Sequence, residues 1–193
     1  MDRKILAAIA VLGATAAMSL APAIAQASPH WYLNGKLLTG KAAAIKTSGT
    51  LTFSNPVIPP VTCTLKDVDM LENPASGGAG VDSMTKFKLS KCGPSPCPAT
   101  KSGKAAPLSV TAPNLPWATE LVEVPPIADE IKGMELVFSC KGTGTILVVN
   151  GTLSPWVGAS LLEFNSPVTG TLGGLYVNGI DTFTSIPVSA KNP

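Results

Sequence analysis

Hydrophobic and polar residues alternate along much of this 193-residue chain, which is the pattern of half-buried β-strands. In residues 49–54, Leu51 and Phe53 fall on one side of the predicted strand, and the intervening Thr and Ser residues fall on the other. The same pattern predicts further strands at residues 30–38, 61–70, 83–92, 115–124, 134–140, 145–153 and 160–164, and two or three more between 168 and 188.

Turn residues separate these segments and decide the fold class. Asn34-Gly35 is typical of a tight hairpin turn, and most of the other breaks contain some of the 18 glycines and 18 prolines. Long blocks of helix-forming residues are absent from the sequence after residue 27. We therefore predict an all-β protein, an antiparallel β-sandwich or barrel-like domain of about 8–10 short strands.

One predicted strand departs from strict alternation. Val61 and Leu65 share a face, whereas Val68 and Met70 fall on the opposite one. A β-bulge shifts the phase of a strand by one residue. The sequence thus predicts a bulge just after Lys66-Asp67.

The beginning of the chain has a different composition. Positions 2–4 are charged, residues 5–20 are apolar or small, and residues 25–27 read Ala-Gln-Ala. This order predicts a secretory signal peptide that is cleaved after Ala27, and one secreted, extracytoplasmic domain over residues 28–193. Because the remaining sequence has no apolar run of 18 residues, we expect no transmembrane span in the mature chain.

Charge and motifs restrict the possible partners. The chain has 14 basic and 12 acidic residues. Asp2, Arg3 and Lys4 belong to the predicted signal peptide, so the positive and negative charges of the mature chain nearly balance. Without a basic stripe, we expect no nucleic-acid partner. The sequence has no nucleotide-binding motif, and Gly77–Gly80 is too short for one, so we expect no cofactor.

The cysteines predict two disulfides, because an even number in an exported chain indicates covalent cross-links. The strands that carry Cys63 and Cys92 flank the Gly-rich loop symmetrically, which favours Cys63–Cys92 and leaves Cys97–Cys140. The alternative is Cys63–Cys140 with Cys92–Cys97, because Cys63 and Cys140 both lie on apolar strand faces. Either pairing fixes the Pro-rich loop predicted at residues 93–107.

Residues suited to catalysis are scarce. His30 is the only histidine, and after cleavage it would be the third residue, behind Pro29. A histidine at the third position can bind copper or nickel together with the deprotonated backbone amides that precede it. Proline has no amide proton to lose, so Pro29 prevents this mode of binding. A catalytic triad would have to use this one histidine near a mobile end of the chain. We therefore expect no catalytic residues and a non-enzymatic protein.

Three acidic residues form a weak candidate for a Ca²⁺ site. Asp67 and Asp69 are two positions apart on a strand and so share a face, and Glu72 follows closely. Carboxylates are suitable Ca²⁺ ligands. We favour a solvated acidic face instead, since acidic side chains are mostly exposed, and we expect no bound metal.

The tryptophans suggest a second candidate site. Trp31, Trp117 and Trp156 are large apolar anchors, and such residues are mostly buried on average. The alternative is that Trp117 and Trp156 form an exposed apolar patch for a hydrophobic small molecule, a lipid or a surface partner.

Short motifs carry two resemblances. The motifs are HWYLNG at 30–35, VTC at 61–63, ENP with GGAG within 72–80, PCP at 96–98 and LPW at 115–117. Together they resemble a group of small secreted bacterial proteins with no assigned function, which implies a shared β-rich fold. VTC and LPW alone also resemble the exported alkane-oxidation protein activators. That resemblance implies an accessory role in the uptake or oxidation of hydrophobic substrates such as alkanes.

Taken together, these features predict an exported, non-enzymatic β-domain with a binding or cell-surface role. The alternative is an accessory protein for hydrophobic substrates, and a secreted hydrolase fits the sequence least well.

Overall fold

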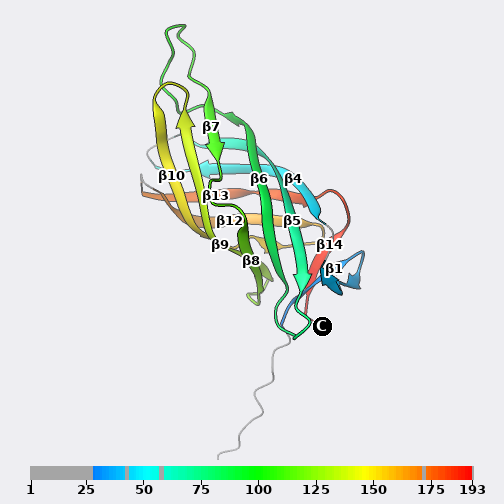
Figure 1. The fold of residues 1–193 in the computed structure, drawn as a ribbon. Helices are drawn as coiled ribbons and strands as arrows, with labels where there is room; N and C mark the ends of the chain where they lie inside the picture. Colours follow the sequence, from blue (N-terminus) through cyan, green and yellow to red (C-terminus); the bar gives the residue numbers. More distant parts are fainter. Residues whose placement is uncertain (1–27, 42–43, 57–58, 171–172, 193) are drawn as a thin grey trace, which may run out of the picture.

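Antiparallel strands dominate the computed structural model of this chain, which describes residues 28–41, 44–56, 59–170 and 173–192. The predicted signal peptide and its cleavage site lie outside the described residues. Within them the strands close into a β-barrel, so the all-β prediction is confirmed, with a barrel rather than a sandwich (Figure 1).

Eight strands of the described residues form the barrel wall, and each pairs antiparallel with its neighbours. Their order around the wall is β13 (Gly173–Phe183), β4 (Ile45–Ser54), β5 (Val61–Asn73), β6 (Val81–Gly93), β8 (Trp117–Val122), β9 (Ala128–Cys140), β10 (Gly144–Leu153) and β12 (Leu161–Gly170). Pairing of β12 with β13 closes the ring. The shorter strands are β1 (His30–Leu33), β2 (Lys36–Leu37), β3 (Gly40–Lys41), β7 (Leu108–Thr111), β11 (Trp156–Val157) and β14 (Val188–Lys191).

Long strands build this wall, whereas the sequence suggested short ones. Strands β5, β6 and β9 have 13 residues each. The described residues between 168 and 188, for which two or three strands were predicted, contain the end of β12, the whole of β13 and the first residue of β14. Strand β13 approaches β4 so closely that a Cβ atom on Gly49 would lie 1.9 Å from the carbonyl oxygen of Ile180. Glycine is therefore required at position 49 for this pairing.

One end of the barrel is covered by a small sheet in the order β14-β1-β2 (Figure 1). Asn34 and Gly35 form its predicted turn, with φ angles of 50° and 74°. Trp31 is buried, and its backbone N–H donates to Asn73 Oδ1 at 2.8 Å. The Asn73 amide donates in return to the carbonyl oxygens of Trp31 and Leu38. These bonds attach the small sheet to the end of β5.

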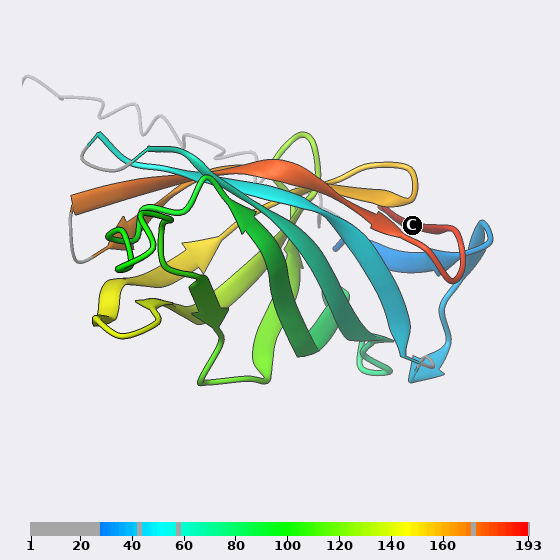
Figure 2. The same cartoon turned by 90° about the horizontal axis from the view of Figure 1, so that it is seen from above.

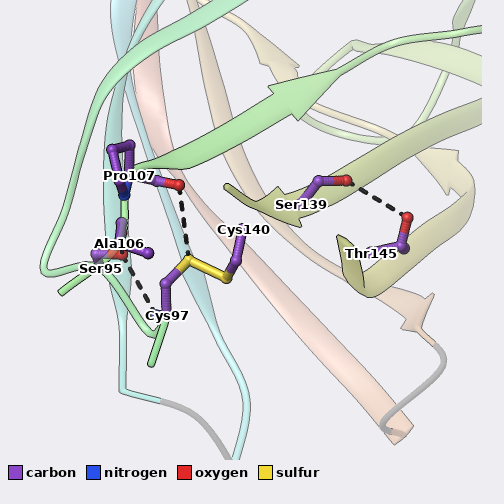
Figure 3. The surroundings of a disulfide bond; sticks show 7 residues. All are labelled: Ser95, Cys97, Ala106, Pro107, Ser139, Cys140 and Thr145. Carbon is purple, nitrogen blue, oxygen red and sulfur yellow. Dashed lines mark hydrogen bonds between the residues drawn. A yellow bond between two sulfur atoms is a disulfide. The ribbon is translucent and has the colours of Figure 1, made fainter. Parts of the chain in front are cut away.

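The disulfides are Cys63–Cys92 and Cys97–Cys140, which confirms the pairing favoured by the symmetry of the β5–β6 hairpin. Cys97 lies in the Pro-rich loop between β6 and β7, and its partner Cys140 ends β9 (Figure 3). In the same loop, the Ser95 hydroxyl donates to the carbonyl oxygen of Ala106 at 2.8 Å. The second disulfide thus fixes the loop to the barrel wall.

Strand β5 keeps a single phase along its whole length, so the bulge predicted in it is wrong. Every odd-numbered residue from Val61 to Asn73 is buried. A register shift does occur at this level of the hairpin, but the additional residue, Thr85, belongs to β6. The inner residues of β5 are consequently apolar as far as Leu65 and acidic at positions 67 and 69.

Candidate functional site

The uninterrupted phase of β5 turns Asp67 and Asp69 into the barrel. Only 3% of Asp67 and 2% of Asp69 is exposed, so the expected solvated acidic face is wrong. Burial follows from the even strand period, because the residues on either side of this segment, Leu65 and Leu71, also point inward. Glu72 has the opposite orientation and is only half-buried, so the three residues of the Ca²⁺ candidate do not come together.

The two aspartates belong to a larger belt of polar side chains around the barrel interior. Six consecutive wall strands contribute to it: Asp181 from β13, Thr47 from β4, Asp67 and Asp69 from β5, Asp82 from β6, Thr119 from β8 and Asp129 from β9. All seven side chains are buried. Cross-strand pairing places Thr47 beside Asp67, and Asp82 beside Thr119. We call this set the aspartate belt.

Few hydrogen bonds satisfy the belt. The Thr119 hydroxyl donates to Asp82 Oδ1. Both carboxyl oxygens of Asp67 and of Asp181, and the Thr47 hydroxyl, have no hydrogen-bond partner of normal geometry. No lysine or histidine belongs to the buried residues of the part of the chain whose side-chain burial is described. Within the same residues, no group of three acidic, His or Cys side chains is placed to hold a metal ion.

Burial without a cation makes the belt hard to ionise, because removal from water disfavours the charged carboxylate. Burial and the nearby Asp69 raise the pKa of Asp67 from 3.8 to about 10. Burial and the nearby Asp129 raise the pKa values of Asp69 and Asp82 well above the ordinary value. The pKa of Asp129 rises only to about 6, since burial is opposed by contacts with Thr119 and Asp82. Asp67 is therefore protonated at neutral pH, and ionisation of Asp69 and Asp82 is disfavoured.

Burial also raises the pKa of Asp181, although contacts with Thr47 and Asp67 act in the opposite direction. The contact between Asp67 and Asp181 thus favours the proton on Asp67 and the negative charge on Asp181. Sequence reasoning missed Asp82, Asp129 and Asp181 as partners of this belt. The signal that could have found Asp181 is its position between Val177 and Phe183, which are also buried, at the same strand period.

The outer face of the same wall is basic. Strands β4, β5 and β6 run side by side as one curved wall, cyan to green in Figure 2. Lys66 of β5 lies directly opposite Lys88 of β6. In the adjoining row, Lys46 and Lys86 lie on either side of Val68. All four lysines are exposed, and we call them the lysine face.

Among the described residues, no carboxylate forms an ion pair with the lysine face. The ion pairs among the described residues are those of Lys132 with Glu120 and Glu130, on β8 and β9. A groove of about 320 Å³ lies between β4 and β5. It is lined by Lys46, Lys66, Val68 and the hydroxyl residues Ser48 and Thr184, together with Thr47 and Asp67, whose side chains are buried. This part of the surface can therefore supply several positive charges and hydroxyl groups to one ligand.

The apolar patch of Trp117 and Trp156 is not formed. Trp117 is 2% exposed, its ring packs on Phe87 with 5.0 Å between centroids, and its indole N–H donates to Asn114 Oδ1 at 2.7 Å. Trp156 alone is on the surface, 41% exposed, with Glu163 opposite it on β12. Trp117 is buried because the strand alternation of β8 continues inward to Thr119 and Leu121.

His30 lies in β1, on the small sheet at the end of the barrel, where its Nδ1 is 2.6 Å from the carbonyl oxygen of Ser28. It is not part of the aspartate belt. No helix among the described residues is long and apolar enough to cross a membrane. Comparison of the chain with protein-family models, with curated proteins and with solved structures gives no significant match.

Proposed function

We propose that this chain is an exported, non-enzymatic binding domain that acts at the cell surface through its lysine face. The observation that carries the proposal is the direct cross-strand pair of Lys66 and Lys88, for which the structure offers no carboxylate among the described residues. Like charges directly opposite each other destabilise a sheet. A local feature that works against the fold is the kind of feature expected where a protein binds a partner.

The interior of the barrel supports a non-enzymatic role. Asp67 and Asp181, one of the pairs of belt carboxyls that act on each other, are both almost fully buried. A substrate needs a concave site that opens to solvent, with catalytic groups inside it. His30, the remaining candidate acid or base, lies on a separate sheet. The belt therefore suits a structural role and the outer wall suits binding.

Export is supported by the covalent framework of the domain. Two disulfides are compatible with an extracellular location, because such bonds persist in oxidising compartments. The predicted signal peptide would direct the chain there. The alternative role with hydrophobic substrates has less support, since Trp117 is buried and only Trp156 of the expected patch is exposed.

Sedimentation of the purified mature protein with isolated cell-envelope fragments of the producing cells tests this proposal. We expect the wild type to sediment with the fragments and the Lys66→Gln/Lys88→Gln variant to remain in solution. Lys101→Gln/Lys104→Gln removes the same charge from the exposed Pro-rich loop and should sediment like the wild type. Equal behaviour of all three proteins, or no sedimentation of the wild type, would overturn the proposal.

A further inference from the structure

We infer that the lysine face binds an acidic polysaccharide, a chain of sugars that carries a negative charge at regular intervals. This inference rests on the proposed function and names the partner of the same surface. It follows from three features of that surface: the spacing of its charges, the hydroxyl groups around them, and a groove lining in which Val68 is the one apolar residue.

The spacing of the lysines suits several anions rather than one. Lys46, Lys66, Lys86 and Lys88 are distributed over three neighbouring strands in two adjoining rows. Strand geometry places the outer strands about 10 Å apart and the rows about 7 Å apart. Four flexible amines that start from positions this far apart cover a larger area than one small anion occupies. A linear chain with repeated negative charges can contact them in succession.

Hydroxyl groups surround these charges. Ser48 and Thr184 line the groove with Lys46 and Lys66. Further along the wall, Thr52 and Thr62 are joined across β4 and β5 by a hydrogen bond of 2.8 Å between their hydroxyl oxygens. Hydroxyls both donate and accept hydrogen bonds, which makes them suitable partners for the hydroxyl groups of sugars.

Apolar and aromatic side chains are absent from the groove lining apart from Val68. Of the large apolar residues that are exposed in the described structure, Leu37, Val124 and Trp156 lie on other elements, whereas Tyr176 and Ile180 lie on β13, the strand next to β4, and do not line the groove. Stable attachment to a membrane needs a buried apolar group in addition to basic residues. Binding of single-stranded nucleic acid uses aromatic side chains on which bases stack. The lysine face lacks both, and an acidic polysaccharide requires neither.

Fluorescence anisotropy with a labelled polyuronate, fragments of alginate, tests this inference at low salt. We expect the wild type to bind and neutral dextran of similar length not to compete. The Lys66→Gln/Lys88→Gln variant should bind about tenfold more weakly, the loss expected when two exposed ionic contacts are removed. Lys101→Gln/Lys104→Gln should bind like the wild type. Added salt should weaken the binding of the wild type, because it screens exposed charges.

Absence of polyuronate binding would overturn the inference, as would an equal affinity of the Lys66→Gln/Lys88→Gln variant. Tighter binding of the wild type to phosphatidylglycerol vesicles or to double-stranded DNA at the same salt concentration would also overturn it. If the envelope fragments retain the wild type through Lys66 and Lys88 while alginate does not bind, the partner class is wrong and the proposed function stands. Thermal unfolding of each variant verifies that the barrel has formed.

Discussion

The two faces of the β4–β5–β6 wall deal with charge in opposite ways. Lys66 and Asp67 are neighbours in the sequence, yet the strand pleat points Lys66 to solvent and Asp67 into the barrel. Inside, the carboxyls have no buried cation among the described residues, and they lower their charge by retaining protons. Outside, the lysine side chains are exposed to water. The comparison shows that a sheet one residue thick can separate carboxyls from amines: burial disfavours ionisation of the inner set, and the outer set stays exposed to a partner.

The largest effect is expected from a change of pH, which acts on the inner face. The belt carboxyls bind protons in the folded state up to a higher pH than in the unfolded chain, where the pKa is about 3.8. Their contribution to stability is therefore complete in acid and is lost as the pH rises towards the folded-state pKa values. Each retained proton corresponds to about 1.4 kcal/mol per pH unit.

Denaturant unfolding at pH 5, 7 and 9 measures this effect. We expect the free energy of unfolding to fall by about 3 kcal/mol or more between pH 5 and pH 9. Asp67 by itself is sufficient for a fall of this size, because its pKa in the folded state is about 10. A free energy that is constant or rises over this range would show that the belt carboxyls ionise normally, and the contrast between the two faces would disappear.

Asp67→Asn tests a single carboxyl of the inner face, and its effect on stability should be smaller than that of the pH change. Asparagine has nearly the same shape, is neutral at every pH, and can donate to Asp181 as the protonated Asp67 would. We expect the variant to be more stable than the wild type at pH 9 by about 1–3 kcal/mol, and its stability to depend less steeply on pH. Unfolding at pH 5 should differ little between the two proteins.

A matched control is Glu163→Gln, which removes a carboxyl from the exposed outer face of β12. This variant should keep the pH dependence of the wild type. If Asp67→Asn and Glu163→Gln gave the same pH profile, Asp67 would not be one of the groups that retain a proton.

Alternation of apolar residues was sufficient to predict an all-β fold and many strands of the wall, although it left open whether they form a sandwich or a barrel. Leu51 and Phe53 in β4, and Leu136 and Phe138 in β9, are buried as the period-two pattern required. The symmetry of the β5–β6 hairpin also identified Cys92 as the partner of Cys63. These features depend on local periodicity and on one hairpin, both of which are visible in a single sequence.

The aspartate belt could not be predicted from alternation, because a prediction from hydrophobicity assigns the more apolar side of each strand to the interior. Val68 and Met70 are more apolar than Asp67 and Asp69, so the sequence indicated a change of phase that β5 does not make. Asp129 and Asp181 lie far along the chain and meet β5 only when the barrel closes. If the period of two residues had been continued from Val61 to Asn73 regardless of hydrophobicity, it would have placed Asp67 and Asp69 inside.

The smallest effect concerns the outer face, where Lys66→Glu places a carboxylate directly opposite Lys88. Opposite charges in this position stabilise a sheet by about 0.2–1 kcal/mol, whereas like charges destabilise it. We expect Lys66→Glu to raise the free energy of unfolding by about 0.5 kcal/mol at low salt, and the gain to shrink at high salt. Lys46→Glu, which faces the uncharged Val68, should give a smaller gain.

The same Lys66→Glu variant should lose its affinity for the acidic polysaccharide, because it replaces one amine of the lysine face with a repelling charge. Stability and binding would then change in opposite directions at one residue. That outcome would explain why two lysines are kept opposite each other although the pair weakens the sheet. If Lys66→Glu were no more stable than the wild type, the pair would be energetically neutral, and its presence would no longer be evidence for a binding role of the outer wall.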